Sequence, residues 1–307
     1  MRRVDAVHLV LMCAAAALAY LVPFELLLLS YVVLGPAHYL TEISWLHDRK
    51  FFLPHRGIAL ALVAVAVGAA FIENGTFFGV VIWLAFVVCA LFAAVTTVVQ
   101  GTILLMAAAL LTIAMAAGGT HFVILGTLLP TLIHVSLFTF VFMVLGALRS
   151  GSKAQALLVA VYLVGIAVIL VVPPSAATVI PKFGAIAHDY FGGVAPALGN
   201  TLGISGLTLD ARITGLLAFV YTYHYLNWFI KADVIRWADI PRSRLALVVA
   251  FSVASTSLYF YDYALGFSVL LGLSLLHVIL EFPLNSLAFR QLGAIVGQRL
   301  VGMAQRA

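Results

Sequence analysis

The sequence has very little charge. Only 9% of its 307 residues are Asp, Glu, Lys or Arg, whereas soluble domains carry about 25%. Hydrophobic residues make up 64% of the chain, and its mean hydropathy is +1.18. This composition excludes an ordinary soluble enzyme and indicates a protein that crosses a membrane several times.

Cysteine is also scarce. Cys13 and Cys89 both lie in apolar runs, which excludes a disulfide framework and a paired-cysteine metal site. The formal net charge is +5, but the basic residues are scattered over short loops and form no run, which argues against nucleic-acid binding. The expected partners are therefore membrane lipids and an apolar substrate, and the oligomeric state is left open.

Apolar runs of about 20 residues predict ten membrane-spanning helices. They are expected at residues 7–22, 24–46, 56–73, 77–98, 101–118, 120–148, 155–172, 211–231, 244–261 and 264–284. We predict an all-α transmembrane helix bundle that forms one integral membrane domain over residues 1–307. A long extracytoplasmic loop is expected at 173–210, and an amphipathic cytoplasmic tail at 285–307.

The basic residues predict the orientation. If Arg2 and Arg3 are cytoplasmic, ten spans place most of the other Lys and Arg residues on the same side, and only Lys182 and Arg212 outside. Cytoplasmic loops are enriched in Lys and Arg. We therefore expect both termini inside, in a bacterial inner (cytoplasmic) membrane.

Ionisable residues inside the apolar spans are the candidate functional groups, because such groups are costly in a bilayer. Four histidines lie on four different even-numbered spans and at comparable predicted depth. Two of them are followed four residues later by a glutamate, on the same helix face. These residues are His38, Glu42, His134, His224, His277 and Glu281.

Imidazole and carboxylate together are typical ligands of non-haem iron. We expect the four histidines to bind a metal, with iron favoured and zinc, copper or haem b as alternatives. Glu42 and Glu281 would orient ligands or complete a second metal position. The simpler alternative is that each polar residue is satisfied locally: a His by a neighbouring helix, Glu42 by Arg49 or Lys50, and Glu281 by water at a helix end before Pro283.

Aromatic and polar residues cluster in "YTYHYLNWFIKADVIRW", residues 221–237. We assign Tyr221 to the catalytic group with Glu42 and Glu281. Tyr39, Tyr225, Asn227 and Trp228 are assigned to substrate binding. The alternative is that these residues are interfacial anchors or ordinary packing, since Trp and Tyr are enriched at membrane interfaces.

The segment "GPAHY" resembles the first histidine motif of the Brp/Blh-type membrane β-carotene 15,15′-dioxygenases, which reads roughly G-x-P-H-G. Gly35, Pro36 and His38 carry the resemblance. The proline lies one place early, Tyr39 stands where the family has glycine, and Glu42 takes the place of a nearby aspartate. The resemblance implies a polytopic protein with histidine-bound iron inside the membrane.

We therefore expect a membrane-embedded non-haem metal oxidoreductase or oxygenase that acts on a lipid-soluble substrate, such as a carotenoid or another isoprenoid. Three alternatives remain open at this point. The histidines could bind b-type haem for electron transfer, or the His and Glu residues could serve a transporter. The chain could also be an accessory subunit of a larger membrane complex.

Overall fold

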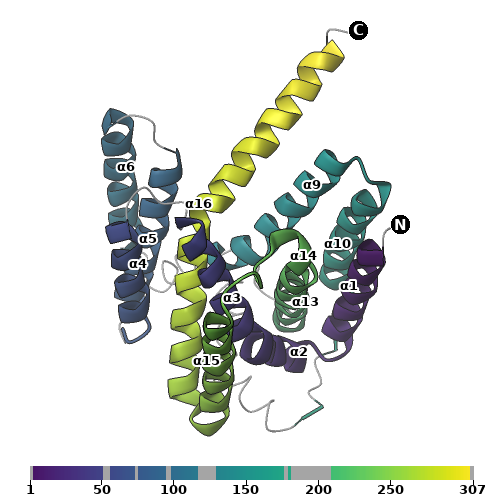
Figure 1. The fold of residues 1–307 in the computed structure, drawn as a ribbon, viewed down its shortest axis with the longest axis horizontal. Coiled ribbons are helices and arrows are strands. Elements are labelled where there is room, and N and C mark those ends of the chain that lie inside the picture. The colour runs from purple at the N-terminus through teal and green to yellow at the C-terminus, as the bar shows by residue number, and fades with distance from the viewer. Residues whose placement is uncertain are drawn as a thin grey trace.

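The computed structural model describes residues 3–50, 56–72, 75–94, 98–116, 129–175, 179–180 and 209–304. The secondary structure in these ranges is entirely helical (Figure 1). The helices of the N-terminal half are α1 (Arg3–Leu21), α2 (Pro23–Leu29), η1 (Ser30–Leu34), α3 (Gly35–Asp48), α4 (Arg56–Ala69), α5 (Gly75–Ala94) and α6 (Val98–Ala116). Those of the C-terminal half are α8 (Leu129–Leu132), η4 (Ile133–Phe138), α9 (Thr139–Ser150), α10 (Lys153–Val171), α13 (Leu209–Ile230), α14 (Ala232–Ile235), α15 (Arg242–Tyr261) and α16 (Tyr263–Ala304).

Within the described ranges, six helical segments are long and apolar enough to cross a membrane. They are Val4–Leu21, Pro23–Asp48, Ile133–Ser150, Lys153–Val171, Arg242–Tyr261 and Tyr263–Arg299. The helical class and the membrane character predicted from composition are thus confirmed. The count of ten spans and the orientation stay predictions, although α4, α5, α6 and α13 coincide in position with the other four predicted spans.

Two of the long helices contain a π-helical turn. Residues 30–34 form the π turn η1 between α2 and α3, and residues 133–138 form η4 between α8 and α9. Such insertions are rare and often occur at functional sites. Pro36 follows the first π turn and has no N–H for the Val32 carbonyl four residues earlier. The Thr256 hydroxyl of α15 donates to that carbonyl at 2.9 Å, so the polar group freed by the proline is satisfied inside the bundle.

The bundle has two large apolar cores. One is formed mainly by α1, α10 and α13, and the other by α4, α5 and α16. In Figure 1, α4, α5 and α6 lie on one side of α16, and α1, α10 and α13 on the other side. Helix α3 packs against α16 and also contacts α13, so the region between the two cores is formed by α3, α13 and α16.

The C-terminal tail is not a separate helix. Helix α16 runs without interruption through Pro283 to Ala304, and its end extends beyond the other helices (Figure 1). The amphipathic cytoplasmic tail at 285–307 stays a prediction, and the structure adds that it continues α16. A proline inside a membrane helix is tolerated where neighbouring groups satisfy the freed carbonyl. Most of the predicted loop at 173–210 lies outside the described residues. Within it, the N–H groups of Val179 and Ile180 donate to the Glu25 carboxylate at 2.6 and 3.1 Å.

Candidate metal centre

The four intramembrane histidines meet in one cluster. They come from four different helical elements: His38 from α3, His134 from η4, His224 from α13 and His277 from α16. Neighbouring ring centroids are 4.7 to 5.3 Å apart around the set. His38 and His134 are fully buried, and His277 and His224 are 2% and 9% exposed. The histidine cluster predicted from the sequence is thus seen in the structure.

His38 lies close to potential metal ligands on two other residues. Its Nε2 is 3.0 Å from Nε2 of His224 and 3.1 Å from Oε2 of Glu42. A neutral imidazole has one N–H, so Nε2 donates to at most one of these neighbours. Its other nitrogen, Nδ1, has no hydrogen-bond partner. Such a convergence of lone pairs suits a shared cation better than a hydrogen-bond network.

The ring of His224 is oriented by a threonine. Nδ1 of His224 lies 2.8 Å from the hydroxyl oxygen of Thr139, the first residue of α9. When Nδ1 donates to this oxygen, Nε2 keeps its lone pair and points it toward His38. Metal-binding histidines usually have a hydrogen bond of this kind on the nitrogen away from the metal. Thr139 was not predicted from the sequence, because one hydroxyl in an apolar helix gives no signal there.

His134 and Glu281 form a second close pair. Nδ1 of His134 is 3.1 Å from Oε2 of Glu281, yet neither atom has a hydrogen bond. Nε2 of His134 and both ring nitrogens of His277 are also buried without a hydrogen-bond partner. Buried polar atoms are almost always paired. This many unpaired nitrogens in one place is therefore informative, and a bound metal ion would satisfy one nitrogen of each ring that it contacts.

The two glutamates lie next to each other within the cluster. The carboxyl groups of Glu42 and Glu281 are close enough to interact, and the side chain of Asn285 lies beside Glu281. Glu42 is 1% and Glu281 5% exposed. The alternatives, hydration of Glu281 at a helix end and pairing of Glu42 with Arg49 or Lys50, do not match this burial. Asn285 follows Glu281 by four residues, and the same i,i+4 rule that linked His277 to Glu281 would have found it.

Aromatic rings enclose one side of the cluster. The ring of Tyr39 stacks on His277 with centroids 4.2 Å apart, and its hydroxyl hydrogen-bonds to that of Tyr225. The rings of Tyr225 and Trp228 lie 5.0 and 5.5 Å from His38. These three residues thus adjoin the histidines, and their assignment to a substrate stays a prediction.

Two other predicted site residues lie further from the cluster. The ring contacts of Tyr221 are with Tyr31 and Tyr225, so it is one ring away from the histidines. Asn227 is partly exposed, and its Oδ1 has no hydrogen-bond partner. The catalytic role for Tyr221 and the substrate-binding role for Asn227 stay predictions, and the structure shows no direct contact with the histidines for either.

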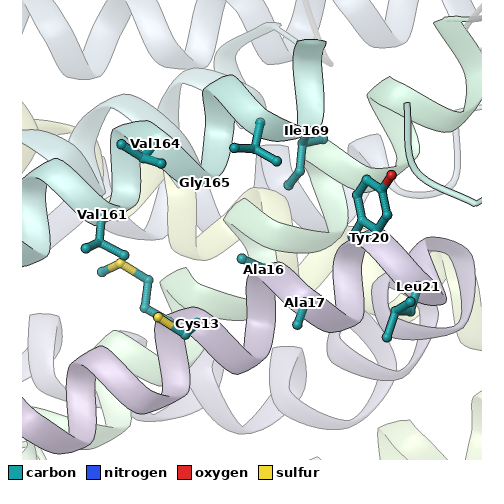
Figure 2. Close-up of a pocket in the computed structure, with 11 residues that line it drawn as sticks. Cys13, Ala16, Ala17, Tyr20, Leu21, Val161, Val164, Gly165 and Ile169 are labelled. Carbon is teal, nitrogen blue, oxygen red and sulfur yellow. The ribbon is translucent and has the colours of Figure 1, made fainter. Parts of the chain in front are cut away.

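An apolar groove lies between α1 and α10, away from the histidines (Figure 2). Its volume is about 470 Å³. Cys13, Ala16 and Tyr20 line it from α1, and Val164 and Gly165 line it from α10. It contains no histidine or carboxylate, so it offers no metal site.

Searches of protein-family models, of curated proteins and of solved structures return no match to this chain. The resemblance of the "GPAHY" segment to the Brp/Blh family therefore stays a prediction. The argument for function rests on the geometry of the cluster.

Proposed function

We propose that the protein is a membrane-embedded non-haem metal oxidoreductase that acts on a lipid-soluble, apolar substrate. The observation that carries this proposal is the buried cluster of four histidines and two glutamates, drawn from four helical elements and rich in unpaired nitrogens. Structural ion pairs seldom leave so many polar atoms unsatisfied in a low-dielectric interior. Iron is the favoured metal, because mixed imidazole and carboxylate ligands suit it.

The donor distances fit ligands of one metal ion. Two ligands about 2.1 Å from a metal, at right angles to each other, lie about 3.0 Å apart. The Nε2 atoms of His38 and His224 are 3.0 Å apart, and the Glu42 oxygen is 3.1 Å from His38. His277 completes a set of three nitrogens within 4.8 Å of one another. These three histidines and Glu42 would hold the ion.

The same distances favour a non-haem centre over b-type haem. Axial nitrogens on opposite sides of one iron are about 4 Å apart, with the macrocycle between them. Here the two closest nitrogens are only 3.0 Å apart, and the other rings fill the space around them. The inward position of the cluster also argues against an accessory subunit that uses these groups to meet a partner.

The surrounding residues define what the site can do. When bound, the metal would supply activation of O₂. Thr139 orients His224, while Tyr39, Tyr225 and Trp228 close one side with aromatic surface and exclude water. This apolar wall suits an elongated hydrocarbon such as a carotenoid or another isoprenoid, entering laterally from the bilayer. We further propose the ten-span, N-in and C-in arrangement in a bacterial cytoplasmic membrane.

Metal analysis of the purified protein, with an optical spectrum, tests the proposal. We expect stoichiometric iron, no Soret absorption, and loss of metal in the variants His38→Ala and His224→Ala. His47→Ala is the matched control, because this histidine is exposed at the end of α3, with a side-chain exposure of 64%. Protein without bound iron, zinc or copper after purification in metal-supplemented medium would refute the proposal.

A further inference from the structure

The cluster offers more donor atoms than one compact set contains. Among the described residues, His38, His224 and His277 each offer a nitrogen within 4.8 Å of the other two. His134 and Glu281 form a separate close pair, with Nδ1 and Oε2 3.1 Å apart. We call His38, His224 and His277 the first subsite.

A second group of donors lies next to the first. His134 is fully buried, and both its ring nitrogens lack a hydrogen bond. Its Nδ1 is 3.1 Å from Oε2 of Glu281, which is unpaired as well. We call His134 and Glu281 the second subsite. It has the donor types that first-row divalent metals take, and no cation of the described chain neutralises it.

The two subsites are joined by carboxyl groups. An oxygen of Glu42 lies 3.1 Å from Nε2 of His38 in the first subsite, and an oxygen of Glu281 lies 3.1 Å from Nδ1 of His134 in the second. The two carboxyl groups adjoin each other. Two carboxyl groups that approach each other between two sets of imidazoles are placed to bridge two ions.

Two helices of the cluster, α3 and α16, carry the same pair of residue types at the same spacing. α3 and α16 each contribute a histidine and a glutamate four residues later, and η4 and α13 each contribute one histidine. Dinuclear carboxylate sites in four-helix bundles are built similarly, from carboxylate and histidine pairs on facing helices. The rings of His134 and His277 are 5.1 Å apart, which places the subsites side by side.

We infer that the centre binds two divalent first-row metal ions, one at each subsite, bridged by Glu42 and Glu281. This inference rests on the proposed function and specifies its metal content. Ions in such pairs are about 3.5–4 Å apart. His134 would then bind only the second ion, and Glu281 would bind the second ion and bridge it to the first.

Metal stoichiometry tests the inference. Metal-free protein in detergent is titrated anaerobically with Fe²⁺, and bound ions are counted after desalting. We expect two ions per wild-type chain and about one per chain in His134→Ala and in Glu281→Gln. The control His8→Gln alters a buried histidine outside the cluster, bonded to Tyr223 at 3.3 Å, and should keep two ions.

The outcomes separate the two proposals. One ion per wild-type chain overturns the inference and leaves the proposed function standing, whereas no bound ion overturns both. Two ions that persist in both variants would also overturn the inference. Glu281→Gln keeps the shape of the side chain, so it remains informative if His134→Ala does not fold. Mn²⁺ gives a second readout by electron paramagnetic resonance: a spin-coupled pair in the wild type and an isolated-ion spectrum in Glu281→Gln.

Discussion

The hydrogen bond between Thr139 and His224 gives the sharpest test of the cluster. Thr139→Val replaces the hydroxyl with a methyl group and preserves the shape of the side chain. Thr139 is 2% exposed, and its oxygen is 2.8 Å from Nδ1 of His224. Removing it leaves a buried N–H without a partner, which costs about 1–3 kcal/mol. The metal-free protein should therefore lose roughly that much stability.

The same substitution should weaken metal binding. Partners of this kind fix the tautomer and the orientation of the ligand, and their loss typically lowers metal affinity about 10–100-fold. Affinity is measured by competition with a chromophoric chelator, and stability by thermal unfolding in detergent. Thr139→Ser retains the hydroxyl and should stay close to wild type.

Thr112→Val is the matched control. Thr112 is also buried, but its hydroxyl donates to the Ala108 carbonyl of its own helix, away from the histidines. We expect its metal affinity to match the wild type. If Thr139→Val binds metal as tightly as Thr112→Val does, the proposed orientation of His224 by Thr139 is refuted.

Two further substitutions test the packing around the site. Tyr39→Phe removes the hydroxyl bonded to Tyr225 but keeps the ring, so it should lower stability by about 1–3 kcal/mol without changing the number of bound metal ions; loss of metal would contradict this. Gly266→Ala places a Cβ 2.2 Å from the Cα of Tyr259, where backbone cannot yield easily, and overpacking of this kind costs about 1–3 kcal/mol or more. Gly293→Ala meets nothing within 4 Å and should be neutral or slightly stabilising, so equal unfolding temperatures for the two glycine variants would show that α15 and α16 are packed differently.

The sequence was sufficient to predict which histidines meet. His38, His134, His224 and His277 are the histidines well inside apolar runs, and the i,i+4 rule added Glu42 and Glu281. This worked because few ionisable groups are tolerated inside a bilayer, so those present are selected for a role. Their mutual orientation could not be predicted, because it depends on how each helix rotates against its neighbours.

Two features of the helices were not predicted from the sequence: the continuation of α16 through Pro283 and the two π turns. The sequence rules for helix ends assume that a proline leaves its carbonyl partner unsatisfied. Inside the bundle, other groups can satisfy such a carbonyl, and α16 continues through Pro283. The π turns at 30–34 and 133–138 were missed for a related reason, since they depend on tertiary contacts. Such a turn shifts the helix face of the residues that follow, which affects the direction of His38 and Glu42.

The distribution of the cluster along the chain has a consequence for biogenesis. His38 and His224 are separated by 186 residues in the sequence. Each helix of the cluster therefore depends on other helices for the contacts of its polar side chains. At about 5–20 residues per second, synthesis reaches α13 roughly 10–40 s after α3. During this interval α3 carries two polar side chains into the membrane without their later partners. The contact between His38 and Glu42, 3.1 Å apart on one helix face, can form as soon as α3 is made. It lowers the free-energy cost of placing these two side chains in the membrane before α13 and α16 are made.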